Sequence, residues 1–209
     1  WDNAYCVHHL TDTHDVILNM LEECRKAGHE DRALMFCSLS KVTFPGAGVA
    51  AMAASRRNID YILKNMFPMI ISFDKLNQVR HIRFLKDMDG LAAHMEKHRA
   101  LLEPKFRAVL AILDEGLSGC GSIARWTKPN GGYFLSLYTL GGCAKRTVQL
   151  CREAGVVLTD AGAAYPYGVD PQDSNIRIAP SFPPVEDVEK AITVFCTCVR
   201  MAALEKLGL

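Results

Sequence analysis

Residues 38–48 read Ser-Leu-Ser-Lys-Val-Thr-Phe-Pro-Gly-Ala-Gly, a short polar turn that leads into a glycine-rich loop. An apolar run of strand length, Arg32–Cys37, comes directly before it. Lys41 is therefore predicted at the carboxyl end of a strand, where α/β proteins bind ligands. A neutral lysine amine at such a place can form a Schiff base with an aldehyde and can later move protons. The alternative is a surface lysine that follows a strand and has no chemical role.

The segments around this turn alternate between strand and helix patterns. A helix is predicted over Asp15–Gly28, because apolar residues recur there at helical spacing and Gly28 can cap the end. A second apolar run, Val49–Ala53, predicts a strand, and a helix is expected around Arg57–Met66. This alternation indicates an α/β layer architecture.

The second half of the chain has a different pattern. Asp87–Leu117 keeps a helical period over an unusual length, interrupted mainly by Pro104, and a helix this long suits a connector between two domains. The segments beyond it predict a small α+β unit. They are strands at Ile123–Thr127 and Tyr133–Tyr138, a helix at Ala144–Ala154, strands at Val156–Leu158 and Asn175–Ile178, and a helix at Val185–Leu207. We expect one domain over residues 1–103 and a second over residues 104–209.

Composition narrows the classes of partner. The 209 residues are 49% hydrophobic and 22% charged, as in soluble globular proteins, and the net charge of +1 suggests neither nucleic acid nor a membrane surface as a partner. No apolar run reaches the length of a membrane span. The 8 cysteines are scattered, without a CxxC pair or zinc spacing, so we expect reduced structural thiols, no metal site and a cytoplasmic location.

A dinucleotide site is the competing interpretation of the glycine-rich loop. Residues 46–51, Gly-Ala-Gly-Val-Ala-Ala, fit the letters of the G-x-G-x-x-A fingerprint. That motif must lie tightly between a strand and a helix, whereas here a loop separates Cys37 from Gly46 and a strand pattern follows. The context does not fit, and we expect no dinucleotide binding.

Two short motifs about one strand–helix unit apart make the first half recognisable. Asp2-Asn3-Ala4-Tyr5 fits D-x-[AP]-Y, and Ser38-Leu39-Ser40-Lys41 fits S-x-S-K. In this order and at this separation the pair resembles the fold-type I aminotransferases, which use pyridoxal 5′-phosphate. The resemblance implies an α/β fold: the C-terminal part of the family's large domain, with a mixed, mostly parallel sheet, followed by the small α+β C-terminal domain.

Later segments agree with this resemblance, which covers the whole chain. Residues 128–134 look like the family's P-x-G-G-x-F turn, and residues 155–162 look like its V-x-x-x-P-G loop with alanine in place of proline. Residues 175–179 look like the strand that bears the carboxylate-binding arginine, here Arg177. Within the family, residues 40–49 and 178–184 most resemble the aspartate aminotransferase branch related to MocR-type domains.

The resemblance assigns roles to individual residues. Lys41 would carry the cofactor as a Schiff base and then move a proton between the substrate's α-carbon and the cofactor's C4′. Asp2 would keep the pyridine nitrogen protonated, and Tyr5 would support the 3-oxygen. Ser38, together with Ser40, would contact the phosphate.

Two further positions concern the substrate. Arg177 would bind its α-carboxylate through two parallel charge-assisted hydrogen bonds, the alternative being a structural ion pair on a strand. The run Asp74–His81 lies where the family often reaches across a dimer interface, so that Lys75, Asn77 or Arg80 could meet a side-chain carboxylate. A solvated helix N-terminus is the slightly favoured alternative. None of the 7 histidines is given a role.

The phosphate site departs from the family pattern. Many members place an arginine a few residues after the lysine, within G-x-R-x-G. When the sequence is aligned on Gly46, that place is taken by Gly48. The phosphate would then depend on Ser38, Ser40, backbone N–H groups or residues outside this chain.

The expected activity is transfer of an amino group between an amino acid, aspartate or glutamate, and a 2-oxo acid, by a homodimer. The chain opens like the end of a strand, so we expect a C-terminal half that is weakly active or inactive alone. One alternative is the cofactor-sensing effector domain of a MocR-type transcription regulator. Another is a sister reaction on the same fold, such as a β-lyase or decarboxylase.

Overall fold

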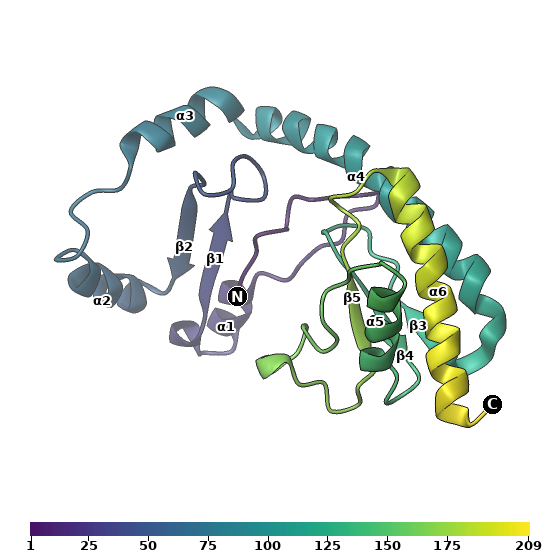
Figure 1. Ribbon diagram of the computed structural model, residues 1–209. Helices are drawn as coiled ribbons and strands as arrows, with labels where there is room; N and C mark the ends of the chain where they lie inside the picture. Colours follow the sequence, from purple (N-terminus) through teal and green to yellow (C-terminus); the bar gives the residue numbers. More distant parts are fainter. The chain divides into compact units, whose positions relative to one another are not determined.

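The computed structural model describes residues 1–209, except for the burial of Gly121. It divides into two compact units, Trp1–His98 and Arg99–Leu209, and each is described by itself (Figure 1).

The strands of unit 1 form a two-stranded antiparallel pair. β1 (Leu34–Ser38) pairs with β2 (Ala50–Ala54), from Leu34 opposite Ala54 to Ser38 opposite Ala50. A parallel bridge joins Asp2 to Phe36 on the other edge of β1, with the Asn3 amide donating to the Phe36 carbonyl at 2.9 Å. The resemblance implies a mixed, mostly parallel sheet, and the described residues of this unit contribute one antiparallel pair and one parallel bridge to it.

The helices of unit 1 begin at side-chain caps. Asn19 caps α1 (Met20–Lys26), Ser55 caps α2 (Arg56–Met66) and Asp74 caps α3 (Lys75–Leu85). The helix predicted over Asp15–Gly28 is therefore wrong in its first turn, because the Asn19 carboxamide accepts from the amides of Leu21 and Glu22 and starts the helix there. A short 3-10 turn, η1 (Glu30–Arg32), precedes β1.

One long helix, α4 (Met88–Leu117), contains Pro104 without a break. A proline inside a helix removes one backbone hydrogen bond and crowds the preceding turn. Apolar burial on both sides of it compensates for this loss, because Leu102, Phe106 and Val109 are all buried. The long helix that the sequence predicts over Asp87–Leu117 is confirmed, and it continues through Pro104.

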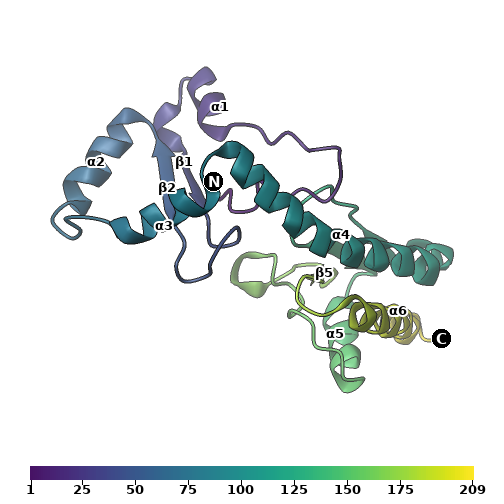
Figure 2. The same cartoon turned by 90° about the horizontal axis from the view of Figure 1, so that it is seen from above.

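Unit 2 contains a three-stranded antiparallel sheet in the order β3-β4-β5. Its strands are β3 (Ala124–Trp126), β4 (Leu135–Thr139) and β5 (Asn175–Ile178). The 3-10 turn η2 (Ser118–Ile123) leads from α4 into β3, and η3 (Pro166–Gly168) lies between α5 and β5. Burial alternates along β4, as expected for a sheet with one face on the core. The helices α5 (Ala144–Glu153) and α6 (Val185–Leu207) pack side by side, as both views show (Figures 1 and 2).

One predicted strand of unit 2 is absent from the residues that the structure describes. Residues 156–158 have no regular secondary structure and form no ladder, and Val157 is 81% exposed. The apolar letters of this segment satisfied the strand pattern, yet no neighbouring strand pairs with it there.

Two bulk expectations can be compared with the structure. Cys143, Cys151, Cys196 and Cys198 are buried in unit 2, as expected of small apolar side chains, whereas Cys37 on β1 is exposed. Among the described residues, no helix has both the length and the apolar character needed to cross a membrane.

Candidate functional site

Lys41 lies in a tight turn directly after β1. The Leu39 amide donates to the Val49 carbonyl at 2.8 Å, which closes the loop at its base. The Val42 and Thr43 amides then both donate to the Leu39 carbonyl, at 3.0 and 2.8 Å. Lys41 is exposed at the start of this turn, while Val42 is buried under it. The backbone therefore holds the lysine at a rigid strand end and directs it outward.

The two serines before Lys41 are hydrogen-bonded to each other. The Ser40 amide donates to Ser38 Oγ at 3.1 Å, and the Ser38 hydroxyl donates to Ser40 Oγ at 2.9 Å. Because Ser40 Oγ accepts the hydrogen bond of Ser38, the hydroxyl proton of Ser40 is left to donate to an oxygen atom of a ligand. The pair is half-buried, so its hydroxyls are partly withdrawn from water.

Gly48 faces Ser40 across the base of the loop. A Cβ at residue 48 would lie 2.5 Å from Ser40 Oγ and 3.0 Å from the Ser40 nitrogen. Only glycine fits against the Ser38–Ser40 pair without a shift, so the structure explains why the family's arginine has no room at this position.

Asp2 and Tyr5 lie beside the same strand. The Asp2 carboxylate is exposed at the end of the bridge to β1, and its Oδ1 accepts from the Ala4 amide at 3.1 Å. Tyr5 follows in a turn, and its ring meets the His8 ring edge-on at a centroid distance of 5.6 Å. Five predicted site residues, Asp2, Tyr5, Ser38, Ser40 and Lys41, are thus brought together on unit 1.

Three histidines that the sequence interpretation passed over contact the lysine turn. His8 Nε2 lies 3.0 Å from the Lys41 carbonyl oxygen, and His94 Nε2 lies 2.7 Å from the Val42 carbonyl oxygen. His81 Nε2 lies 2.7 Å from Thr43 Oγ1. No sequence pattern marks a histidine that binds a distant carbonyl, so only the fold reveals these contacts.

The Asp74–His81 run forms the cap and the N-terminal half of α3, which agrees with the alternative of a solvated helix N-terminus. Asp74 caps the helix by accepting from the Asn77 amide at 2.9 Å, and Lys75 and Arg80 are exposed. The Asn77 carboxamide instead supports the glycine-rich loop, because its Nδ2 donates to the Ala47 carbonyl at 2.7 Å.

Arg177 lies on unit 2, in strand β5 opposite Ser136. Its guanidinium carbon is 4.7 Å from the centre of the Phe134 ring. Its Nε is buried and meets no hydrogen-bond partner among the described residues, so the alternative of a structural ion pair on the strand finds no support at this atom. A guanidinium held on an aromatic face can receive an anion at its outer edge.

Asp170 organises the approach to β5 and was not predicted. Its buried carboxylate accepts from the amides of Gln172, Ser174 and Asn175 at 2.7–2.9 Å. Burial raises the pKa of this carboxyl, but these hydrogen bonds and one from the Ser174 hydroxyl outweigh it, and the pKa lies below its ordinary value. The charged form of Asp170 thus fixes the start of the strand that carries Arg177.

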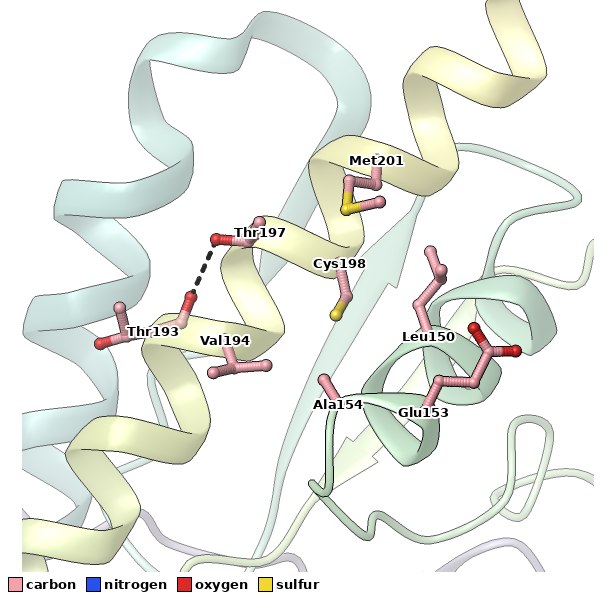
Figure 3. Close-up of a pocket in the computed structure, with 8 residues that line it drawn as sticks. All are labelled: Leu150, Glu153, Ala154, Thr193, Val194, Thr197, Cys198 and Met201. Carbon is pink, nitrogen blue, oxygen red and sulfur yellow. Dashed lines mark hydrogen bonds between the residues drawn. The ribbon is translucent and has the colours of Figure 1, made fainter.

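A separate groove lies between α5 and α6 (Figure 3). Its walls are mainly apolar, with Leu150, Val194 and Met201 among them, and the Thr197 hydroxyl donates within α6 to the Thr193 carbonyl at 3.3 Å. None of the predicted site residues lines it, so the Lys41 turn remains the candidate site.

Comparison with known proteins decides the family. The sequence pattern of the family described as "Aspartate amino-transferase" matches residues 1–208. The chain belongs to the aspartate amino-transferase family. Within it, a Mycolicibacterium smegmatis relative whose name includes aminotransferase is 49% identical over 207 residues, which are 99% of this chain and 48% of that protein.

Solved structures of aminotransferases share the fold. The aspartate transaminase of Corynebacterium glutamicum is 44% identical with a TM-score of 0.94, over 99% of this chain and 48% of that one. A Thermus thermophilus α-aminoadipate aminotransferase, solved with N-(5′-phosphopyridoxyl)-L-leucine, is 21% identical with a TM-score of 0.75, over 97% and 50% of the two chains. The α/β fold class is thus confirmed. The chain spans about half the length of the curated relatives it matches, in agreement with the expected C-terminal half.

Proposed function

We propose that this chain is part of a pyridoxal-phosphate-dependent enzyme that moves an amino group between aspartate or glutamate and a 2-oxo acid. The observation that carries the proposal is the placement of Lys41 at the end of β1, directly after the linked pair Ser38–Ser40. The name of the C. glutamicum relative, aspartate transaminase, supports the choice of substrate.

The residues of unit 1 carry functional groups that suit pyridoxal phosphate. Ser38 and Ser40 provide hydroxyls for a phosphate, and the absence of a side chain at Gly48 lets the backbone come close to them. Lys41 provides an exposed amine, and Asp2 provides an exposed carboxylate at the bridge to β1. The ligand named for the T. thermophilus relative is a phosphopyridoxyl amino acid, which agrees with this chemistry.

When bound, pyridoxal phosphate supplies an electron sink for the substrate's α-carbon. Asp2 would hold a proton on the pyridine nitrogen, and the Tyr5 hydroxyl would hydrogen-bond the 3-oxygen. The Lys41 amine would carry the cofactor, then take the α-proton of the substrate and return it. Arg177 would orient the substrate by binding its α-carboxylate in a two-bonded fork.

Kinetics of an arginine pair test the substrate assignment. Arg125 on β3 is the matched control, since its guanidinium also lies on a ring, 4.0 Å from the centre of Tyr138, but it is exposed. In the whole enzyme that contains this chain, loaded with pyridoxal phosphate, Arg177→Gln should lower kcat/KM for aspartate at least about tenfold, the effect of losing a hydrogen bond between charged groups. Arg125→Gln should stay within about twofold. Equal effects of the two substitutions would contradict the role of Arg177.

The proposal includes a homodimer. Residues 61–88 expose several large apolar side chains, a surface that a second chain or another part of the same protein would cover. They are Tyr61, Phe67, Met69, Ile71, Leu76 and Met88. The MocR-type alternative has no support from the relatives named above, whose names describe aminotransferases.

A further inference from the structure

The turn that carries Lys41 receives side chains from three separate elements. His8 comes from the segment after Tyr5, His81 from α3 and His94 from α4, at sequence separations of 33, 38 and 52 residues from their partners. Their contacts fall on three consecutive residues, at the carbonyls of Lys41 and Val42 and the hydroxyl of Thr43.

The acceptors fix which ring nitrogens carry protons. A carbonyl oxygen only accepts, so His8 and His94 must each donate from an Nε2–H. Burial lowers the pKa of His8, and its side chain is only 2% exposed, so it acts as a neutral donor. An imidazole in this state holds a backbone carbonyl without placing a positive charge beside the Lys41 amine.

His81 supports the far side of the same turn. Its Nδ1 lies 2.9 Å from the Asn77 carbonyl, one helical turn earlier, so that nitrogen is also a donor. Thr43 Oγ1, which His81 contacts, lies 3.1 Å from the Leu39 carbonyl that already accepts two turn amides. Asn77, on the same face of α3, holds Ala47. One face of α3 thus supports the loop at two points.

We propose that His8, His81 and His94, the supporting histidines, are positioning residues that fix the Lys41 turn so that the amine is presented to the cofactor. This inference rests on the proposed function and adds to it which residues hold the lysine. A histidine with only a structural role in a core would hydrogen-bond to any nearby acceptor. These three histidines instead contact successive residues of one turn. His8 in addition contacts both Tyr5 and Lys41, and so connects two of the proposed cofactor contacts.

The test compares substitutions that remove or keep the donor. His94→Leu removes it, and His94→Gln keeps an amide N–H that can reach a carbonyl. The pair His8→Leu and His8→Gln repeats the comparison, and the half-buried His94 pair stays decisive if a His8 variant does not fold. His14→Leu is the control, because His14 is exposed and stacks on His9 at a centroid distance of 3.6 Å instead of contacting the turn carbonyls.

Two readouts are measured. The first is hydrogen–deuterium exchange of residues 39–44 without cofactor. The second is the rate at which added pyridoxal phosphate becomes reducible by borohydride onto Lys41, followed by peptide mass spectrometry. We expect the leucine variants to exchange about tenfold faster and to form the Lys41 link about tenfold more slowly. The glutamine variants should recover most of both, and His14→Leu should change neither.

Unchanged hydrogen–deuterium exchange in His94→Leu would overturn the inference. Faster exchange with an unchanged rate of Lys41 linkage would also overturn it, because the histidines would then have a structural role only. Failure of the unmodified protein to link at Lys41 would instead contradict the proposed function. Exchange without cofactor distinguishes that failure from failure of the inference.

Discussion

Gly48 is the residue at which space is most restricted beside the candidate site. Gly48→Ala would place a Cβ 2.5 Å from Ser40 Oγ and close to the Ser40 backbone. Because the turn must move to relieve this contact, we expect a loss of about 1–3 kcal/mol in the free energy of unfolding. Urea unfolding measures it. Gly119→Ala is the control, since a Cβ there meets nothing within 4 Å, and an equal loss in both variants would contradict the steric argument.

Asp170 carries a pH dependence with a defined sign. Its folded-state pKa lies below the ordinary value, so the charged carboxylate stabilises the fold at neutral pH. This contribution is fully present above the ordinary pKa of about 3.9 and is lost as the pH falls through the lower folded pKa. Asp170→Asn should therefore be less stable at pH of about 7 by about 1–3 kcal/mol, with the difference shrinking in acid. Urea unfolding across this range measures it, and a difference independent of pH would be inconsistent with this assignment.

At the residue scale, local motifs predicted the residues proposed to carry the chemistry but not the histidines that contact their turn. Lys41, Ser38 and Ser40 are adjacent in sequence, so their common place after a strand could be read directly. His8 and His94 contact carbonyls 33 and 52 residues away, and such contacts depend on the tertiary fold. Arg177 was found through the resemblance, and its stacking on Phe134 required the structure.

At the element scale, Pro104 in α4 is the most testable feature. Pro104 cannot donate to the carbonyl four residues earlier, and its ring crowds that turn. Pro104→Ala should therefore raise the free energy of unfolding of the protein by about 1–3 kcal/mol. The gain is limited because alanine gives the unfolded chain more conformational freedom than proline does. Differential scanning calorimetry measures it as a higher Tm. A lower Tm would mean that the proline sets a bend that the packing requires.

Elements with strong periodicity were predicted well, and those set by local caps or by partners were not. The strand at Asn175–Ile178 and the helix at Val185–Leu207 have the predicted bounds. The start of α1 depends on the Asn19 cap, which competes with the apolar pattern before it. Residues 156–158 have the apolar pattern of a strand but no neighbouring strand to pair with among the described residues, so the pattern alone did not produce a strand there.

At the scale of the whole molecule, membership of the aspartate amino-transferase family accounts for the order of the motifs along the chain. The antiparallel β1–β2 pair was not foreseen, because strand direction depends on how the chain returns after residues 38–49 rather than on composition. The predicted α+β character of the second half agrees with unit 2, whose antiparallel sheet and flanking helices come from consecutive segments.

The most direct test of the central claim is to locate the lysine that carries pyridoxal phosphate. The protein is incubated with the cofactor, reduced with borohydride and digested, and the modified lysine is identified by peptide mass spectrometry. We predict a single major site at Lys41 that disappears in Lys41→Ala, while the exposed control Lys64→Ala keeps it. Modification spread over several lysines, or its persistence in Lys41→Ala, would contradict the assignment of Lys41 as the cofactor-bearing residue.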